Sequence, residues 1–437
     1  MHPRLVLAKL DEHPLRHRLN IEFHARPPVP LVGGALIAHL VFQHSDTNDA
    51  DERENLASLC KGLVCTAIDN SDSHLTLETA SFRMRWERHT EFSSYTFFRP
   101  LAVAEVLDAD ATALDAVHLD WMQGIPGKLL VATQVELRST DEISADSVLA
   151  GLTPSGRTMV AARVADKAAW VFSDFKINNG FSRFLVLNES MTQRQTGRTV
   201  QRLVEIETYR MLALLGLPIA KETGRWLYAS EQRLADLMDQ IGRASSSQDE
   251  RDALAALSAL AAEVEHSVAR TTFRFGASDA YQRMVMQRIE ELRESRISGL
   301  PTFAEFMQRR LQPGMRTCEA ISHRQEELSA RVARNSQLLR TRVDIELERQ
   351  NQELLGQMNT RAQMQLRLQE TVEGLSVVVL TYYGSQLVHQ LAKASVPLHH
   401  QSTDLITALS IPVIAVIVAW GTWRMRRKLA TESAAAH

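Results

Sequence analysis

The sequence of 437 residues contains few cysteines. Only Cys60, Cys65 and Cys318 are present, and no two of them form the CxxC pair of a zinc site or a redox motif. Isolated thiols in odd number suit a reducing compartment, whereas small secreted domains depend on paired cysteines. The composition therefore excludes a disulfide framework and gives no support for a cysteine-based zinc site.

Motifs of the common enzyme classes are also missing. The sequence contains no P-loop, no GxGxxG after a strand-like run, no GxSxG and no HExxH. The net charge is only -3, which gives no overall electrostatic attraction to nucleic acid. We therefore predict no catalytic residues, no bound metal ion and no nucleic-acid partner, and the sequence leaves any cofactor unknown.

A run without formal charge dominates the C-terminal end. Leu405–Trp423 is uncharged, and at about 1.5 Å per residue it spans roughly the ~30 Å hydrocarbon core of a bilayer. Trp420 lies near its end and four basic residues follow it, as is typical of a membrane interface. A second uncharged run, Gly374–Ala392, contains Tyr, Gln and His and is the weaker candidate. We predict that both runs span the membrane, as a transmembrane hairpin within residues 374–428.

Charge predicts the orientation of these spans. The basic residues after Trp423 favour a cytoplasmic C-terminus by the positive-inside rule. Lys393–Asp404 is a short connection, so two spans would return the preceding residues to the cytoplasm. Met1–Val41 lacks a basic region followed by a long apolar core and a cleavage site, so no signal peptide is expected. If only the second run crossed, the large domain would lie outside without a signal that exports it.

This orientation predicts a location and a partner. We expect a protein of the bacterial inner (cytoplasmic) membrane, with its bulk and both termini on the cytoplasmic side. The lipid bilayer is its predicted partner.

One face of the first predicted span is polar. Tyr382, Gln386, His389 and Lys393 follow one another at gaps of four, three and four residues, which places them on one side of a helix. Polar groups at membrane depth are costly and often functional. They also form hydrogen bonds between neighbouring helices, so the stripe either binds the second span or lines a pathway. These four residues are the candidate intramembrane polar face.

The residues before the spans predict an α+β fold. Residues 1–190 alternate strand-like and helical runs in the order β-α-β-β-α-β, the split βαβ order of ferredoxin-like folds. We therefore expect a ferredoxin-like α/β sandwich with a mostly antiparallel sheet. The expected strands are 34–42, 74–86, 90–98, 128–137, 157–164, 169–175 and 181–187, and the expected helices are 48–63 and 102–122.

The hydrophobic period changes from two to about 3.6 near Gly197, which predicts a helical domain over residues 191–373. Within it, 317–373 lacks proline and contains only one glycine, Gly356. We therefore expect one long stalk helix that runs into the first span.

The stalk helix has a narrow apolar seam. Val332, Val343 and Leu354 belong to a series at gaps of four and seven residues, as in coiled coils. A seam of this kind must be covered, either by the helices before it or by another copy. We expect a homo-oligomer, or a partner protein that binds through the stalk helix.

An N-terminal segment rich in His and Arg supplies the first candidate binding residues. Its prolines force an extended or turned backbone, so a loop is expected. Arginine forks suit a carboxylate or a phosphate, and histidines suit a metal or a proton. The alternative is a solvated arm whose end packs on the sheet. The candidates are His13, Arg16, His17, Glu22, His24 and Arg26.

Glu87, Arg88 and His89 are a second candidate group, at the turn expected between the strands 74–86 and 90–98. The tip of a hairpin with these side chains can present a proton-handling group to a cleft. Hairpin tips also solvate charge easily, and the spacing defines neither a nucleophile nor an oxyanion donor.

Four segments together resemble a known family. They are Glu22–Pro27 (EFHARP), Trp86–Phe92 (WERHTEF), Gln201–Arg210 (QRLVEIETYR) and Arg309–Leu311 (RRL). With these segments in this order, the chain resembles the DUF3422 family of uncharacterised, membrane-anchored bacterial proteins. The resemblance covers essentially the whole chain, and it implies no activity, substrate or catalytic residue.

The layout favours a membrane-anchored scaffold or adaptor, in which an α/β binding domain is presented on a stalk. A first alternative is an oligomeric ion channel, because the layout is similar to that of CorA-type divalent-cation channels. Those channels carry Gly-Met-Asn after the first span, where this sequence reads Gln390–Pro397 without that motif. A second alternative is an enzyme that binds a metal or a phosphate through the N-terminal loop, for which several convergent ligands are required.

Overall fold

A computed structural model describes the chain at residues 10–17, 19–20, 27–44, 49–59, 66–70, 73–102, 105–107, 111–152, 159–244, 246–395 and 400–434. The chain divides into two compact units. The first unit comprises Met1–Arg243 and Ala255–Ser336, and the second comprises Ala244–Leu254 and Gln337–His437. The sheet lies in the first unit and the predicted membrane segment lies in the second.

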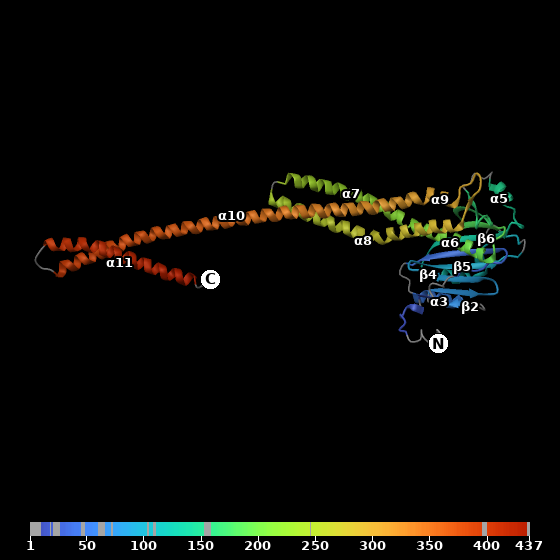
Figure 1. The fold of residues 1–437 in the computed structure, drawn as a ribbon, viewed down its shortest axis with the longest axis horizontal. Coiled ribbons are helices and arrows are strands. Elements are labelled where there is room, and N and C mark those ends of the chain that lie inside the picture. Colours follow the sequence, from blue (N-terminus) through green and yellow to red (C-terminus); the bar gives the residue numbers. More distant parts are fainter. Residues whose placement is uncertain are drawn as a thin grey trace. The chain divides into compact units, whose positions relative to one another are not determined.

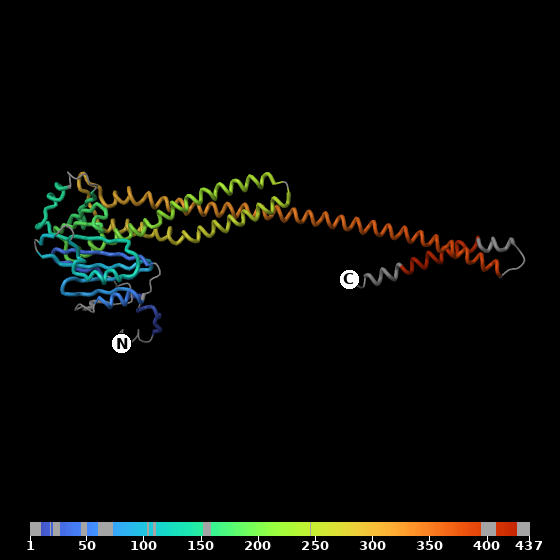
Figure 2. The backbone as a smooth tube through the Cα atoms, turned by 180° about the vertical axis from the view of Figure 1, so that it is seen from behind, coloured from blue at the N-terminus to red at the C-terminus, as the bar shows by residue number. Residues whose placement is uncertain are grey.

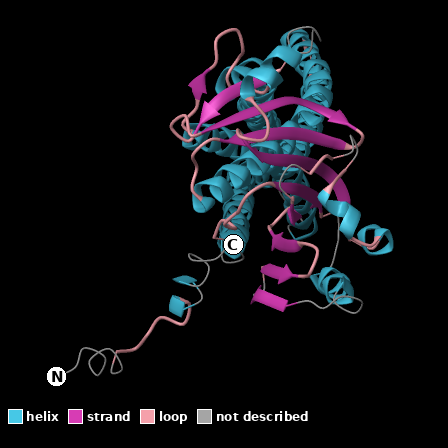
Figure 3. Ribbon diagram, turned by 90° about the vertical axis from the view of Figure 1, so that its right-hand side faces the viewer, coloured by secondary structure: helices cyan, strands magenta, loops and turns pink. Residues whose placement is uncertain are grey.

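Within the described residues, ten strands form one sheet (Figure 3). Their order is β10-β7-β8-β9-β6-β1-β5-β4-β3-β2, and all neighbours are antiparallel except β6 and β9, which are parallel. The strands are β1 (Ala35–Gln43), β2 (Thr66–Asn70), β3 (His74–Glu78), β4 (Arg83–Arg88), β5 (Phe92–Pro100), β6 (Lys128–Ser139), β7 (Val160–Val164), β8 (Ala169–Asn178), β9 (Phe181–Asn188) and β10 (Ser295–Arg296).

The centre of the sheet has the strand order β6-β1-β5-β4, with antiparallel neighbours, as a split βαβ unit requires. Its two connections contain α3 (Asp49–Leu59), and η1 (Ala113–Ala116) with α4 (Leu119–Gln123). These helices pack on the same face of the sheet. The prediction of an α+β class is therefore confirmed, and further strands extend the sheet on both sides of this centre.

The single helix predicted over 102–122 is wrong. Residues 105–107 are not helical, and the described residues of this stretch contain only the short helices η1 and α4. Thr112 begins η1 as its N-cap, and the Asp115 carboxylate accepts a hydrogen bond from the Thr112 backbone N–H (2.9 Å). Such a capping box starts a new helix in the middle of the segment, which the apolar periodicity alone does not reveal.

The two faces of the sheet pack against different helices. On face A, Leu36, Ala38 and Leu40 of β1 join an apolar cluster with α3, η1 and α4. On face B, His39 of β1 contacts α6 (Gln193–Leu214). This arrangement follows from the alternation of side chains along a strand.

Helices make up most of the chain after β9 (Figure 1). Strands give way to helices between β9 and α6, next to the predicted domain boundary at 190/191, but α6 packs on the sheet and belongs to the same unit. The remaining helices are α5 (Ala145–Leu152), α7 (Gly216–Arg243), α8 (Ser247–Leu292), α9 (Phe303–Arg310), α10 (Gln312–Ser395) and α11 (His400–Ala434).

Polar contacts join α7, α8 and α10 within the first unit. Arg324 of α10 binds Glu231 of α7 (Nη2 to Oε2, 2.7 Å), and Thr271 of α8 donates a hydrogen bond to Gln325 of α10 (3.1 Å). Leu234 of α7 and Leu328 of α10 are buried. The three helices therefore pack together as a bundle.

In the second unit, α10 continues to Ser395, so the expectation of one unbroken helix through 317–373 into the first uncharged run is confirmed. The helix α11 runs back along α10 (Figure 2). The two pack closely at Gly384, where an added Cβ would lie 2.9 Å from Ile414 Cγ2. Among the described residues, one helix, α11 over Ala408–Met425, is long and apolar enough to cross a membrane, and none of that stretch is buried.

Candidate functional site

Glu87 and Arg88 of β4 lie on opposite faces of the sheet, because consecutive strand residues alternate. Glu87 pairs with Arg85 on face B (2.7 Å), whereas Arg88 pairs with Glu52 of α3 on face A. The ring of His89 stacks on Phe92 at the turn, with 4.4 Å between centroids. The three side chains therefore do not lie together at one tip.

The arginine of the face-B pair, Arg85, is buried and has a second contact. Arg85 is only 6% exposed. Its Nη2 binds Glu87, and its Nη1 donates a hydrogen bond to the carbonyl of Pro27 (3.0 Å). Arg85 therefore fastens the chain that follows the N-terminal loop to the sheet.

His39 lies at the middle of the same face. Its Nδ1 is 2.8 Å from the hydroxyl of Thr96 on β5, and its Nε2 is 3.1 Å from the hydroxyl of Thr208 on α6. Burial lowers the pKa of His39 to about 3, with further lowering by His89 and Arg85. His39 is therefore a neutral hydrogen-bonding group that joins the strand to the helix.

A tyrosine pair and an ion pair extend this contact to α8. Arg274 Nη2 binds the carboxylate of Glu91 at 2.6 Å, and both side chains are largely buried. Tyr281 lies on the same face of α8 and stacks on Tyr209 of α6, with 5.8 Å between centroids. Burial, followed by the charge of Glu91, raises the pKa of Tyr281 to about 12. Burial also raises the pKa of Tyr209.

A second ion pair joins α6 directly to α8. Glu205 of α6 binds Arg288 of α8, and Arg288 also binds Glu291 (3.0 Å). Glu207, buried in the same helix, binds Arg210 through two hydrogen bonds of 2.6 and 2.8 Å. The guanidinium of Arg210 lies over the ring of Phe175. Glu205 and Glu207 of α6 are thus both paired with arginines of the protein itself.

We call these groups the sheet–helix network. Its carboxylates Glu87, Glu91 and Glu205 are each paired with an arginine. The network consists of His39, Arg85, Glu87, Glu91, Thr96, Glu205, Thr208, Tyr209, Arg274, Tyr281 and Arg288. Because its charges compensate one another, the arrangement holds the sheet against α6 and α8 and does not present a free charge to a ligand.

A smaller polar cluster lies on face A beside α3. Glu52 is fully buried and binds Arg88, and His44 Nε2 is 3.4 Å from its other carboxylate oxygen. His44 Nε2 is also 2.9 Å from Ser93 Oγ. Burial and the Glu52 charge raise the pKa of Tyr95 nearby. This cluster fixes α3 to β4 and β5 in the same way as the network fixes α6.

The N-terminal candidates lie on the surface where they are described. Arg16 and His17 both contact Glu12, at 2.6 and 3.0 Å, and His13 accepts a hydrogen bond from the Leu15 backbone N–H. These side chains are exposed. The part of the chain that the structure describes contains no group of three His, Cys, Asp or Glu side chains able to hold a metal ion. The other three candidates, Glu22, His24 and Arg26, lie outside the described residues.

A cavity of about 450 Å³ lies on face A near β6. Its most buried charge is Arg138, which binds Glu136 (2.9 Å), Glu142 (3.4 Å) and the carbonyl of Glu105 (2.9 Å). A hydrogen bond from the Ala102 backbone and then Arg99 lower the pKa of Glu105. The acceptors around Arg138 are therefore supplied by the protein, so the cavity does not offer an unpaired arginine to an anion.

The predicted polar face of α10 is exposed in this chain. The helix α11 packs beside it, at Gly384 and the buried Ser385. Tyr382 is 59% exposed, and Gln386 and Lys393 are exposed as well, whereas His389 is partly covered. The helix α11 therefore packs mainly on a different side of α10 from the stripe.

Several groups of the network were not identified from the sequence. Arg274, Tyr281 and Arg288 recur every seven residues, which places them on one face of α8 and is the signal that was available. His39 interrupts an otherwise apolar strand, which is a second such signal. Their partners lie far away in the chain, so spacing alone does not pair them.

The fold and the network define an α+β protein with a long helix that leads to an apolar C-terminal helix. The chain belongs to the family described as a protein of unknown function (DUF3422), which matches residues 11–429. None of the curated proteins compared with the chain matches it. Three of the four segments on which the resemblance depends meet at the sheet–helix network, through Pro27, Glu87 and Glu205.

Proposed function

We propose that the protein is a membrane-anchored scaffold or adaptor, with its α+β unit on the cytoplasmic side of the bacterial inner membrane. The observation that carries this proposal is the uncovered apolar surface of α11. All of Ala408–Met425 is unburied, including Val416 and Trp420. Exposed apolar surface of this extent is costly in water and favourable in lipid.

The packing of α10 on α11 supports a two-span hairpin over 374–392 and 405–423. Helices in lipid associate through small residues that let their backbones approach. Gly384 and Ser385 supply such residues on α10, and Ile414 of α11 fits against Gly384. Both termini then lie on the cytoplasmic side.

The sheet–helix network supports a binding role over catalysis. Its charges are paired inside the protein and its histidine is neutral, so it gives the unit rigidity and leaves recognition to the surface. The ferredoxin-like centre of the sheet and the stalk then act as a platform and a spacer. The ligand of this platform is a protein or small molecule near the membrane surface.

Alkaline extraction of membranes that contain the full chain tests the anchor. We expect the natural chain to stay in the membrane pellet. Val416→Lys places a charge in the middle of α11, at a cost of about 2.5–3.5 kcal/mol at the centre of a span, and should release part of the chain into the supernatant. Gln363→Lys, on an exposed polar position of α10, is the matched control and should remain in the pellet. Release of the natural chain itself would contradict the proposal.

The exposed polar stripe of α10 favours one second candidate, an oligomeric channel or transporter. Tyr382 and Gln386 are exposed beside α11. Several copies of the chain could therefore arrange these polar side chains around an ion pathway. Ion flux into liposomes that contain the purified protein, lost in Gln386→Leu and kept in Leu387→Ala, would favour transport over the scaffold.

A further inference from the structure

A single stripe of side chains runs along α10 from Leu347 to Lys393. Successive members are separated alternately by four and three residues, which is the heptad spacing of a coiled coil. Leu354, Leu368 and Leu375 occupy one of its two positions. The predicted polar face continues the same spacing through Tyr382. The apolar seam of the stalk and the polar stripe of the first span are therefore one continuous surface.

Most of this surface is exposed in the single chain. Leu354 is 58% exposed and Leu368 is 67% exposed, although both are large apolar side chains. The helix α11 packs on Gly384 and Ser385 and leaves the stripe exposed except at His389, which is partly covered. Exposed leucines and valines that recur at heptad spacing along a helix mark an interface.

We propose that a second copy of this chain covers the stripe, as a parallel, in-register, two-stranded coiled coil that begins at Leu347 and continues into the membrane. The proposal rests on the membrane anchor proposed above. Two copies held by the same segment in the same bilayer point in the same direction and stand at the same height. Identical residues of the stripe then face each other.

The side chains of the stripe fit two parallel copies. Leu368 and Leu375 alternate with Val372 and Val379, and this combination of leucine with a β-branched residue favours two strands. Asn351 lies at a position where a polar residue typically restricts register and oligomer state. The stripe therefore contains both the apolar contacts and a device that aligns them.

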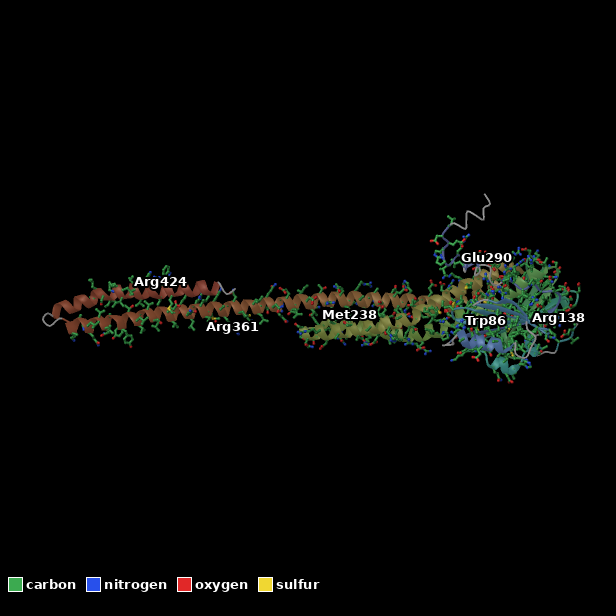
Figure 4. The ribbon with its side chains drawn as sticks, turned by 90° about the horizontal axis from the view of Figure 1, so that it is seen from below. Trp86, Arg138, Met238, Glu290, Arg361 and Arg424 are labelled. Atoms are coloured by element: carbon green, nitrogen blue, oxygen red, sulfur yellow. The ribbon has the colours of Figure 1, made fainter. Side chains whose placement is uncertain are left out.

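Charge also permits self-association. The positions that flank the stripe between Leu355 and Val378 carry no charged residue, so identical chains do not repel each other there. Arg361, which lies along α10 (Figure 4), is the only charged member of the stripe before its histidine. In a pair of chains its long side chain could reach solvent while its apolar stem stays in the interface. The sequence pattern thus suits a second copy better than an oppositely charged partner.

The area of the stripe is sufficient for a stable pair. At about 1.5 Å per residue, Leu347 to Lys393 is roughly 70 Å long, and a strip about 10 Å wide along it covers about 700 Å² on each copy. Two such strips fall within the range of about 1,200–2,000 Å² that specific interfaces bury. Within the membrane, Gln386 meets its own counterpart, and two amides can donate and accept hydrogen bonds in the way that polar residues join helices in lipid.

Disulfide cross-linking of the full chain in membranes tests the proposal. The background carries Cys60→Ser, Cys65→Ser and Cys318→Ser, and single cysteines are then introduced at Leu368 in the stripe or at Gln363 on the opposite face. Facing positions in register bring the two Cβ atoms within reach of a disulfide. We expect mild oxidation to convert Leu368→Cys into a species of twice the chain mass, with Gln363→Cys at the level of the cysteine-free background.

Equal cross-linking of both variants, no cross-linking of either, or a product with a different protein would overturn the proposal. A second readout uses two tagged copies in one cell, whose co-purification should be lost in Leu354→Arg with Leu368→Arg and kept in Gln363→Arg. Membrane extraction of the same samples separates the two proposals. A cross-linked chain found in the supernatant would contradict the anchor but not the pair, and an uncross-linked chain in the pellet would contradict the pair but not the anchor.

Discussion

Gly197 shows how one residue positions the segment that follows the N-terminal loop. It lies in α6, and an added Cβ would be only 2.0 Å from the carbonyl oxygen of Val29. The backbone N–H of Leu31 also donates to the carbonyl of Gln193 (3.2 Å). The segment can cross the helix this closely only because no side chain is present at position 197.

We expect Gly197→Ala to destabilise the first unit by about 1–3 kcal/mol, as overpacking of a tight contact does. Denaturant unfolding measures this change, and hydrogen exchange at the Leu31 amide should become faster. Gly276→Ala is the matched control, because nothing lies within 4 Å of a Cβ there and α8 should gain about 0.5–1 kcal/mol. Equal effects of the two substitutions would show that the crossing does not depend on Gly197.

His39 makes stability depend on pH. Its pKa is about 3 in the folded chain against 6.5 for the free side chain, so the unfolded chain binds more protons between these values. The free energy of unfolding should therefore fall as pH decreases from about 6.5 towards 3, by up to about 1.4 kcal/mol per pH unit from this group. His39→Gln keeps hydrogen-bonding groups but does not titrate, so its stability should fall less over the same range. Parallel pH profiles for the two proteins would contradict the assignment.

At the scale of elements, the sheet–helix network joins segments that are distant in the chain. Glu91 and Arg274 are 183 residues apart and connect the end of the β4–β5 hairpin to α8. Their pair is largely buried, so breaking it leaves an uncompensated charge between the two elements. The network therefore determines how α8 is held against the sheet.

A double-mutant cycle measures this connection. We expect Glu91→Ala and Arg274→Ala to show a coupling of about 1.5–3 kcal/mol in the free energy of unfolding, as hydrogen-bonded charged groups do. The pair Arg233–Glu263, which is about half exposed on both sides, is the control and should couple by about 0.2–1 kcal/mol. Coupling in the first pair no greater than in the control would show that the network does not hold α8.

The sequence predicts some elements well and others poorly, for physical reasons. The strand order around β1 follows from alternation and the split βαβ pattern, and the unbroken α10 follows from the lack of proline. The helix over 102–122 failed because a cap at Thr112 begins a separate short helix. The network escaped prediction because its partners are set by packing across the sheet, and Glu87 and Arg88 separated because neighbouring strand residues face opposite ways.

At the scale of the whole molecule, the chain combines a rigid α+β unit with a second unit of long exposed helices. The first unit is held together by paired charges and by buried apolar clusters. The second unit exposes the apolar residues of α10 and α11, and we propose that lipid and a second copy cover them. Anchoring and self-association would thus complete a structure that the single chain leaves uncovered.

The orientation of the two ends of the chain tests the anchor most directly. Reporter proteins that are active on only one side of the membrane can be fused before Met1 or after His437 of the full chain. The two-span hairpin predicts that both reporters show a cytoplasmic location. Reporters on opposite sides of the membrane would show that the chain crosses once, and would contradict the account of a hairpin-anchored scaffold.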